Sequence, residues 1–142
     1  MERKCTNQPF LILMQTSRAI QDRIRDDMLK NNLSITDFSV LEVLFHKGKQ
    51  TIHQIGKSVL ITSGSMTYVI DKLEQKGLLK RSACPDDRRA IHVSLTVAGR
   101  ELMNRIMPEH ESFVDNIFDS LNSHDVDNLV DLLKRVKEKV DN

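Results

Sequence analysis

The feature that most constrains the fold of this chain is a close succession of helix-capping signals between residues 34 and 77. Two capping boxes and a further N-cap candidate precede a glycine suited to a helix end, and these residues are Ser34 with Asp37, Thr51 with Gln54, Thr62, and Gly77. Apolar residues recur at helical spacing after each start. The pattern predicts three short helices in succession, with only Leu60-Ile61 between the last two.

Directly after Gly77 the pattern changes from helical to alternating. Leu79–Ala83 and Ala90–Leu95 predict two strands, and the charged segment Cys84–Arg89 between them predicts a loop. Two capped helices joined by a very short turn form a helix-turn-helix, and a β-hairpin placed directly after them makes it a winged one. The sequence therefore predicts a winged helix-turn-helix.

Long amphipathic helices are expected on both sides of this unit. Residues 8–31 repeat isoleucine and methionine at intervals of four, which predicts one N-terminal helix. Thr96 caps a second long helix, which should extend to Leu121 and be kinked by Pro108. Asn122, with an aspartate three residues later, opens the last helix.

We predict one domain, residues 1–142, of mainly α class with a small β-hairpin wing. The winged helix-turn-helix lobe occupies about 34–96. The outer helices, about 8–31 and 97–141, carry more apolar positions than one small lobe can cover. Long helices of this kind bury their apolar faces by association, so the outer helices are predicted to form a homodimer.

Charge is distributed unevenly along the chain. Lys47–Arg89 contains nine basic and four acidic residues, a net charge of +5, whereas Glu101–Asn142 contains five basic and ten acidic residues, a net charge of −5. This distribution favours an anionic partner for the middle of the chain, and chance scatter of solvated charges is the alternative. Because no apolar run is long enough to span a membrane, we expect a cytoplasmic protein.

The second helix of a helix-turn-helix places its N-terminal half in the major groove of DNA. Here that helix carries small, hydroxylated residues and then a basic one, and the predicted DNA contacts are Ser63, Gly64, Ser65, Thr67, Tyr68 and Lys72. Arg88 and Arg89 at the hairpin tip suit a narrow minor groove, where negative potential is concentrated. Asp87 is predicted to orient an arginine by a bidentate pair. The alternatives are packing of Tyr68 against Leu78 and a merely solvated tip.

Several motifs in this region carry a family resemblance: Leu33-Ser34 with Phe38, Val40 and Leu41; the run Thr67–Glu74; Lys76-Gly77-Leu78; Arg81; Asp87-Arg88-Arg89; and Val93-Ser94-Leu95-Thr96 with Gly99. In these residues the chain resembles the MarR family (multiple antibiotic resistance regulators). The resemblance implies homodimeric winged-helix regulators of transcription whose first and last helices form the dimer interface. It also implies a small-molecule pocket or an oxidisable cysteine. The expected function is a repressor that binds a pseudo-palindromic operator in double-stranded DNA.

Release from the operator is expected from a small-molecule effector, such as a phenol, a quinone or another electrophile, or from modification of a thiol. Cys5 and Cys84 are the candidate redox sensors, and ordinary unreactive thiols are the alternative for both. Cys84 stands between basic residues, a setting that favours a reactive thiolate.

Other classes of function find less support. The sequence contains no phosphate-binding loop, no G-x-S-x-G motif and no metal-ligand motif, so we predict no enzyme, no cofactor and no metal site. A zinc site drawing on His110 with Glu109 or Glu111 is the alternative for the histidines. A winged helix that binds only protein is the third class of function, but it would not need basic residues concentrated on the helix and wing.

Overall fold

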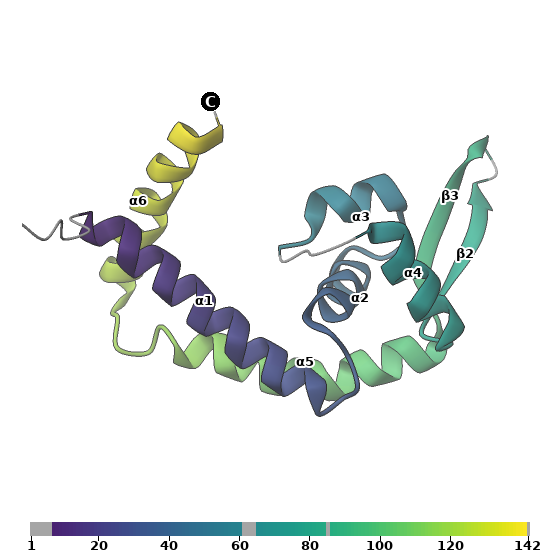
Figure 1. The fold of residues 1–142 in the computed structure, drawn as a ribbon, viewed down its shortest axis with the longest axis horizontal. Coiled ribbons are helices and arrows are strands. Elements are labelled where there is room, and N and C mark those ends of the chain that lie inside the picture. The colour runs from purple at the N-terminus through teal and green to yellow at the C-terminus, as the bar shows by residue number, and fades with distance from the viewer. Residues whose placement is uncertain (1–6, 61–64, 85, 142) are drawn as a thin grey trace, which may run out of the picture. The chain divides into compact units, whose positions relative to one another are not determined.

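A computed structural model describes residues 7–60, 65–84 and 86–141. Its elements in chain order (Figure 1) are α1 (Gln8–Leu29), α2 (Ile35–Lys47), β1 (Gln50–Thr51), α3 (Ile52–Ser58), α4 (Met66–Gln75), β2 (Leu79–Cys84), β3 (Asp87–Leu95), α5 (Val97–Asn116) and α6 (Ser123–Asp141). The chain divides into two compact units, residues 1–104 and 105–142. None of the described helices is long and apolar enough to cross a lipid bilayer.

The helix α2 lies at the centre of the first unit, since nine of its 13 residues are buried. Its predicted capping box is confirmed: the Asp37 N–H donates to Ser34 Oγ at 3.0 Å, and the Ser34 N–H donates to Asp37 Oδ2 at 2.9 Å. These bonds satisfy two main-chain donors at the start of the helix. The preceding helix α1 begins where it was predicted and ends at Leu29, two residues before the predicted end at residue 31.

The helix-turn-helix consists of α3 and α4. The capping box of α3 is confirmed, because the Gln54 N–H donates to Thr51 Oγ1 at 3.1 Å and the Thr51 N–H donates to Gln54 Oε1 at 2.8 Å. The predicted start of α4 is wrong: its N-cap is Ser65, and not Thr62. A helix begun at Thr62 would carry Gly64 in its first turn, where glycine is a poor helix former.

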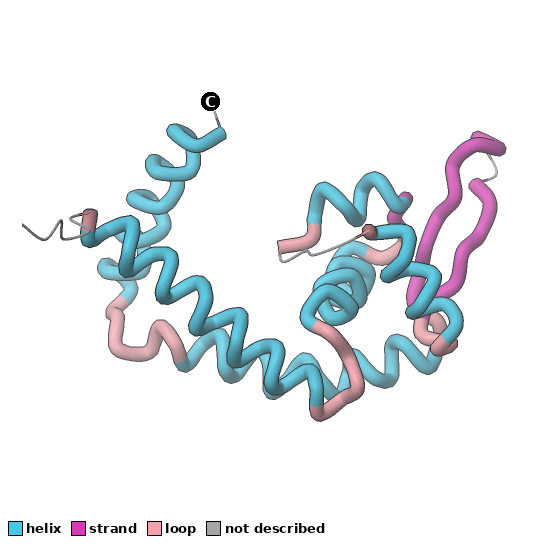
Figure 2. The backbone as a smooth tube through the Cα atoms, in the orientation of Figure 1, coloured by secondary structure: helices cyan, strands magenta, loops and turns pink. Residues whose placement is uncertain are grey.

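The three strands form one antiparallel sheet in the order β1-β3-β2, drawn in magenta in Figure 2. The predicted loop Cys84–Arg89 is too long, because β2 extends to Cys84 and β3 begins at Asp87. Cys84 pairs directly with Asp87, after a register irregularity next to Ala83. Pairing through the tip gives main-chain polar groups hydrogen-bond partners, and the charged side chains there can remain in water.

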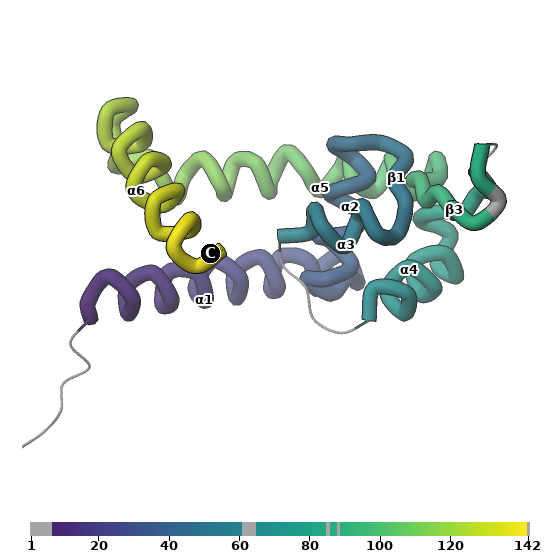
Figure 3. Tube along the Cα trace, turned by 90° about the horizontal axis from the view of Figure 1, so that it is seen from above, coloured from purple at the N-terminus to yellow at the C-terminus, as the bar shows by residue number. Residues whose placement is uncertain are grey.

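The core of the first unit forms where α2 contacts α3, α4 and β3. Figure 3 shows these helices gathered in one group. The fully buried apolar side chains in this unit come from all of its layers and include Leu41, Leu44, Ile55, Ile70, Leu73, Leu79, Val93 and Met103. This core fixes the rotation of α4 about its axis, and hence decides which of its side chains face outward.

The helix α5 begins in the first unit, and its C-terminal part belongs to the second unit together with all of α6. The Thr96 cap at the start of α5 is confirmed by the Gly99 N–H, which donates to Thr96 Oγ1 at 3.0 Å. The helix continues through Pro108 but ends at Asn116, and therefore does not reach Leu121 as predicted. Turns stabilised by i,i+3 hydrogen bonds follow. Asn122 and Asp125 then form the predicted reciprocal cap of α6.

Candidate nucleic-acid interface

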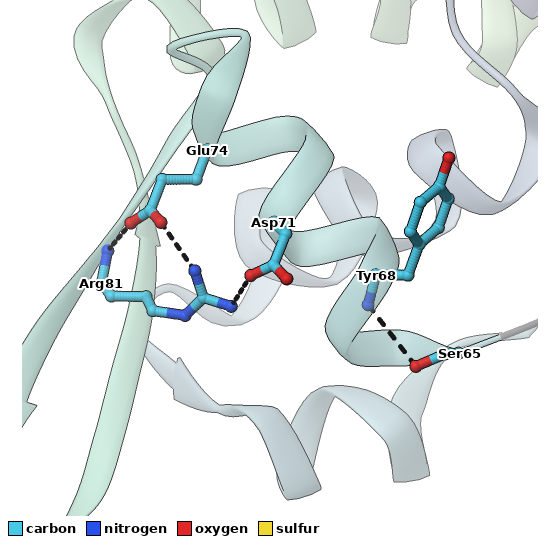
Figure 4. A network of polar contacts seen from close by, with 5 residues as sticks. All are labelled: Ser65, Tyr68, Asp71, Glu74 and Arg81. Carbon is cyan, nitrogen blue, oxygen red and sulfur yellow. Dashed lines mark hydrogen bonds and ion pairs between the residues drawn. The ribbon is translucent and has the colours of Figure 1, made fainter.

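The N-terminal half of α4 presents a polar face to solvent. Val69 and Ile70 are buried, whereas Thr67 is exposed and the Tyr68 side chain is 67% exposed. Ser65 is exposed as well, and its Oγ accepts the main-chain N–H of Tyr68 at 3.5 Å (Figure 4). Tyr68 is therefore free of the core packing that was its alternative role. The face offers three hydroxyl groups and one aromatic ring to an incoming partner.

Three of the predicted site residues, and the side chain of a fourth, fall outside the described part of the structure. Ser63 and Gly64 precede the first described residue of α4, and Cys5 precedes α1. The side chain of Arg88 is also outside the described part, although its backbone belongs to β3. Their proposed roles therefore rest on the sequence.

An arginine from the hairpin binds two acids of α4, and we call this arrangement the Arg81 clamp (Figure 4). The guanidinium of Arg81 donates from Nη1 to Glu74 Oε1 at 2.6 Å and from Nη2 to Asp71 Oδ1. The Arg81 main-chain N–H also donates to Glu74 Oε2 at 3.2 Å. These contacts, above all the hydrogen bond with Asp71, raise the pKa of Arg81 above its ordinary value. The clamp joins β2 to α4 and pairs both acids with a cation.

At the hairpin tip, Asp87 makes a main-chain contact. Its Oδ1 accepts the N–H of Arg89 at 2.9 Å, whereas a bidentate pair with a guanidinium was predicted. Short polar side chains commonly bond the backbone two residues onward, and this contact needs no ordering of a long side chain. Arg89 itself is exposed, and Cys84 is a half-buried free thiol.

Lys72, which was predicted to contact DNA, forms an ion pair inside the protein. Its Nζ lies 3.0 Å from Asp37 Oδ2 in α2, and the Lys72 side chain is 34% exposed. Just after the end of α4, at its C-cap, Lys76 Nζ donates to the main-chain oxygen of Asn32 at 2.9 Å. The sequence did not predict either contact. Asp37 was expected only to cap α2, and no periodicity of the sequence relates positions in α2 to positions in α4.

The start of α5 packs tightly on the turn that follows α4. Thr96 Oγ1 donates to Gly77 O at 2.6 Å, and the Thr96 N–H donates to Leu78 O at 3.1 Å. Gly77 has φ +75°, as expected for a glycine that ends a helix. A Cβ placed on Gly99 would overlap the Leu78 carbonyl oxygen, so this close approach requires glycine. These contacts fix the end of α4 relative to the start of α5.

Comparison with known sequences identifies a protein family. A profile described as MarR family matches residues 33–91, which include α2, α3, α4 and most of the hairpin. The transcriptional regulator MhqR of Bacillus subtilis (strain 168) is 43% identical to this chain over 127 residues. The matched part is 89% of this chain and 88% of that protein.

Solved structures share the fold over nearly the whole chain. BpsR of Bordetella bronchiseptica, whose DNA binding is regulated by 6-hydroxynicotinic acid, is 25% identical and has a TM-score of 0.80. The match covers 96% of this chain and 98% of BpsR. A mutant of MarR from Escherichia coli in complex with operator DNA is 21% identical, with a TM-score of 0.78 and coverage of 94% and 99%.

Proposed function

Because this chain belongs to the MarR family, and is therefore a transcriptional regulator and not an enzyme, we propose that it is a homodimeric repressor of a pseudo-palindromic operator. The observation that carries the proposal is the outward face of α4. Its apolar side is buried, and Thr67 and Tyr68 project from the end that enters the major groove in helix-turn-helix proteins. E. coli MarR, which shares the fold, has been solved with operator DNA bound.

In this proposal α4 and the hairpin bind different grooves of the operator. Thr67 and Tyr68 reach base edges or phosphates from α4, and the predicted contacts Ser63, Gly64 and Ser65 lie at its start. Arg89, exposed at the tip and held by Asp87 through its main chain, enters the adjacent minor groove. Arg88 is assigned the same groove from the sequence.

Exposed apolar side chains on the outer helices support the homodimer. Within the described residues of α1 and α6, the large apolar side chains that are at least 41% exposed include Phe10, Ile12, Leu13 and Met14 in α1, and Val130, Leu132, Leu133, Val136 and Val140 in α6. No residue of α6 is buried. Burial of apolar surface contributes about 25 cal/mol per Å², so association of two such chains is favourable. A two-fold dimer also supplies the two reading helices that a pseudo-palindrome requires.

The proposed function also requires a signal that releases the protein from DNA. We assign this signal to a small-molecule effector, which from the sequence is expected to be a phenol, a quinone or another electrophile, and the phenol is favoured because the DNA binding of BpsR is regulated by a hydroxylated aromatic acid. Modification of a thiol is the second route, and it would use Cys84 next to the hairpin tip or Cys5.

The test is selection of bound duplexes from a random pool with the full chain, combined with light scattering of the protein alone and of the complex. We expect a two-fold symmetric motif whose half-sites lie about one helical turn, 10–10.5 base pairs, apart. Two chains should bind each duplex, and the free protein should scatter as twice the chain mass. Failure to enrich any motif, or binding of a single chain to an asymmetric site, would refute the proposal.

A further inference from the structure

The buried carboxylate of Asp37 has an unusual set of partners. Its side chain is 1% exposed, and Oδ2 accepts the Ser34 N–H and lies 3.0 Å from Lys72 Nζ. The other oxygen, Oδ1, has no hydrogen-bond partner among the described residues. Helix capping accounts for the contact with the Ser34 N–H, and the oxygen of a neutral side chain could accept that hydrogen bond equally well. Capping therefore does not explain why a negatively charged side chain is buried at this position.

The energetics make Lys72 essential to this arrangement. Burial of a carboxylate is costly unless an opposite charge or several hydrogen bonds compensate for it. Lys72 supplies the charge from α4, and the capping N–H is the other contact of Oδ2. Removing the ammonium alone would leave a buried charge unpaired, whereas removing both charges together would relieve the penalty.

Lys76, the C-cap of α4, adds a second contact with the same part of the chain. It lies one turn after Lys72, on the same face, and binds the main-chain oxygen of Asn32. Asn32 has φ +60°, in the left-handed region, between the end of α1 and the start of α2. Lys72 of α4 and Lys76, the C-cap of that helix, therefore hold residues 32–37, while the Arg81 clamp holds the acids of α4 to the hairpin.

We propose that Lys72 is a positioning residue: through its pair with buried Asp37 it sets the placement of α4 for operator reading, and it does not contact a DNA phosphate. The inference rests on the proposed DNA binding and assigns a role within it. It makes residues 32–37, which are the end of the connection from α1 and the first turn of α2, part of the support of α4.

The two roles for Lys72 differ in their salt dependence. A lysine bound to a phosphate releases a counterion, so its loss lowers the slope of log K against log salt by about one unit. A lysine that acts through Asp37 changes affinity without changing the number of phosphates neutralised, so the slope stays the same. The roles also differ in whether a second change at Asp37 can restore binding.

The experiment measures operator affinity over a range of salt for Lys72→Met, Asp37→Asn and the double variant, with Lys80→Met as the matched control. Lys80 is an exposed lysine of β2 in the same unit. Asparagine at position 37 keeps an acceptor for the cap. Urea unfolding of each variant without DNA shows that it is folded at the assay temperature.

We expect each single variant to weaken binding about tenfold, with an unchanged salt slope. The double variant should recover most of the affinity, and because it buries no unpaired charge it remains a valid test if Lys72→Met unfolds. A slope lowered by one unit in Lys72→Met, with no recovery in the double variant, would show a direct phosphate contact. Tighter binding by Asp37→Asn alone would show simple repulsion and also overturn the inference. If the unaltered protein binds no duplex, the proposed function itself fails.

Discussion

Gly99 provides the sharpest test of how the lobe is held together. The glycine lies in the first turn of α5, where its N–H donates to Thr96 Oγ1. An alanine Cβ at this position would overlap Leu78 O and lie 3.0 Å from the Leu78 carbonyl carbon. Both atoms belong to the backbone, so no side-chain rotation can relieve the overlap. Gly99→Ala therefore forces α5 away from the turn after α4.

The magnitude follows from the contacts that this movement breaks. Carbon and oxygen approach to about 3.3 Å, so the start of α5 must shift by about 1 Å. That shift stretches the bonds from Thr96 to Gly77 O and Leu78 O, each contributing about 1 kcal/mol. Residual strain adds about 1–3 kcal/mol, and the better helix propensity of alanine returns about 1 kcal/mol. The expected net loss of unfolding free energy is about 2–4 kcal/mol.

Urea unfolding at a fixed protein concentration measures this loss, because association makes stability depend on concentration. With a slope of about 2 kcal/mol per M, the midpoint should fall by about 1–2 M. Gly56→Ala is the matched control: Gly56 lies in α3 with no atom within 4 Å of the added Cβ, so it should stabilise by about 0.5–1 kcal/mol. A stabilising Gly99→Ala would refute the close contact with Leu78.

The remaining predictions concern DNA and thiols. Arg89→Ala should weaken operator binding and lower the salt slope by about one unit, whereas Asp87→Ala should weaken it at every salt concentration because the tip must then be ordered on binding. Tighter binding by Asp87→Ala would make that residue a repulsive bystander. Tyr68→Ala should cost about 1–3 kcal/mol of operator affinity, and Tyr68→Phe separates the ring from the hydroxyl. If a quinone releases the DNA through a thiol, Cys84→Ser or Cys5→Ser should abolish that release. Release that persists in the double variant would assign the signal to a reversibly bound ligand.

Local signals in the sequence were sufficient for most helix starts. The structure confirms the reciprocal caps at Ser34, Thr51 and Asn122. They could be predicted because each cap joins residues only three positions apart. Thr62 failed as a start because several hydroxyl residues competed for one cap and the glycine between them decided the outcome. The end of β2 was predicted one residue too early and the start of β3 three residues too late, because charge at residues 87–89 was taken as evidence of a loop.

The contacts between elements could not be predicted in the same way. The Arg81 clamp joins residues seven and ten positions apart, and the Lys72–Asp37 pair joins residues 35 positions apart. No helical or strand periodicity relates such positions, so they require the tertiary structure. The exposure of Ser65, Thr67 and Tyr68 was predicted correctly, because the apolar residues of α4 already defined its inner side.

The Arg81 clamp has a consequence for protein engineering. Because Asp71 and Glu74 are paired with a strand residue outside α4, a reading helix moved alone into another scaffold would bring two acids without their cation. Such a graft would place two uncompensated negative charges on the helix that is meant to approach DNA. A chimaera that exchanges α4 together with the hairpin keeps the pair intact, so the smallest transferable reading module of this protein is the helix with its wing.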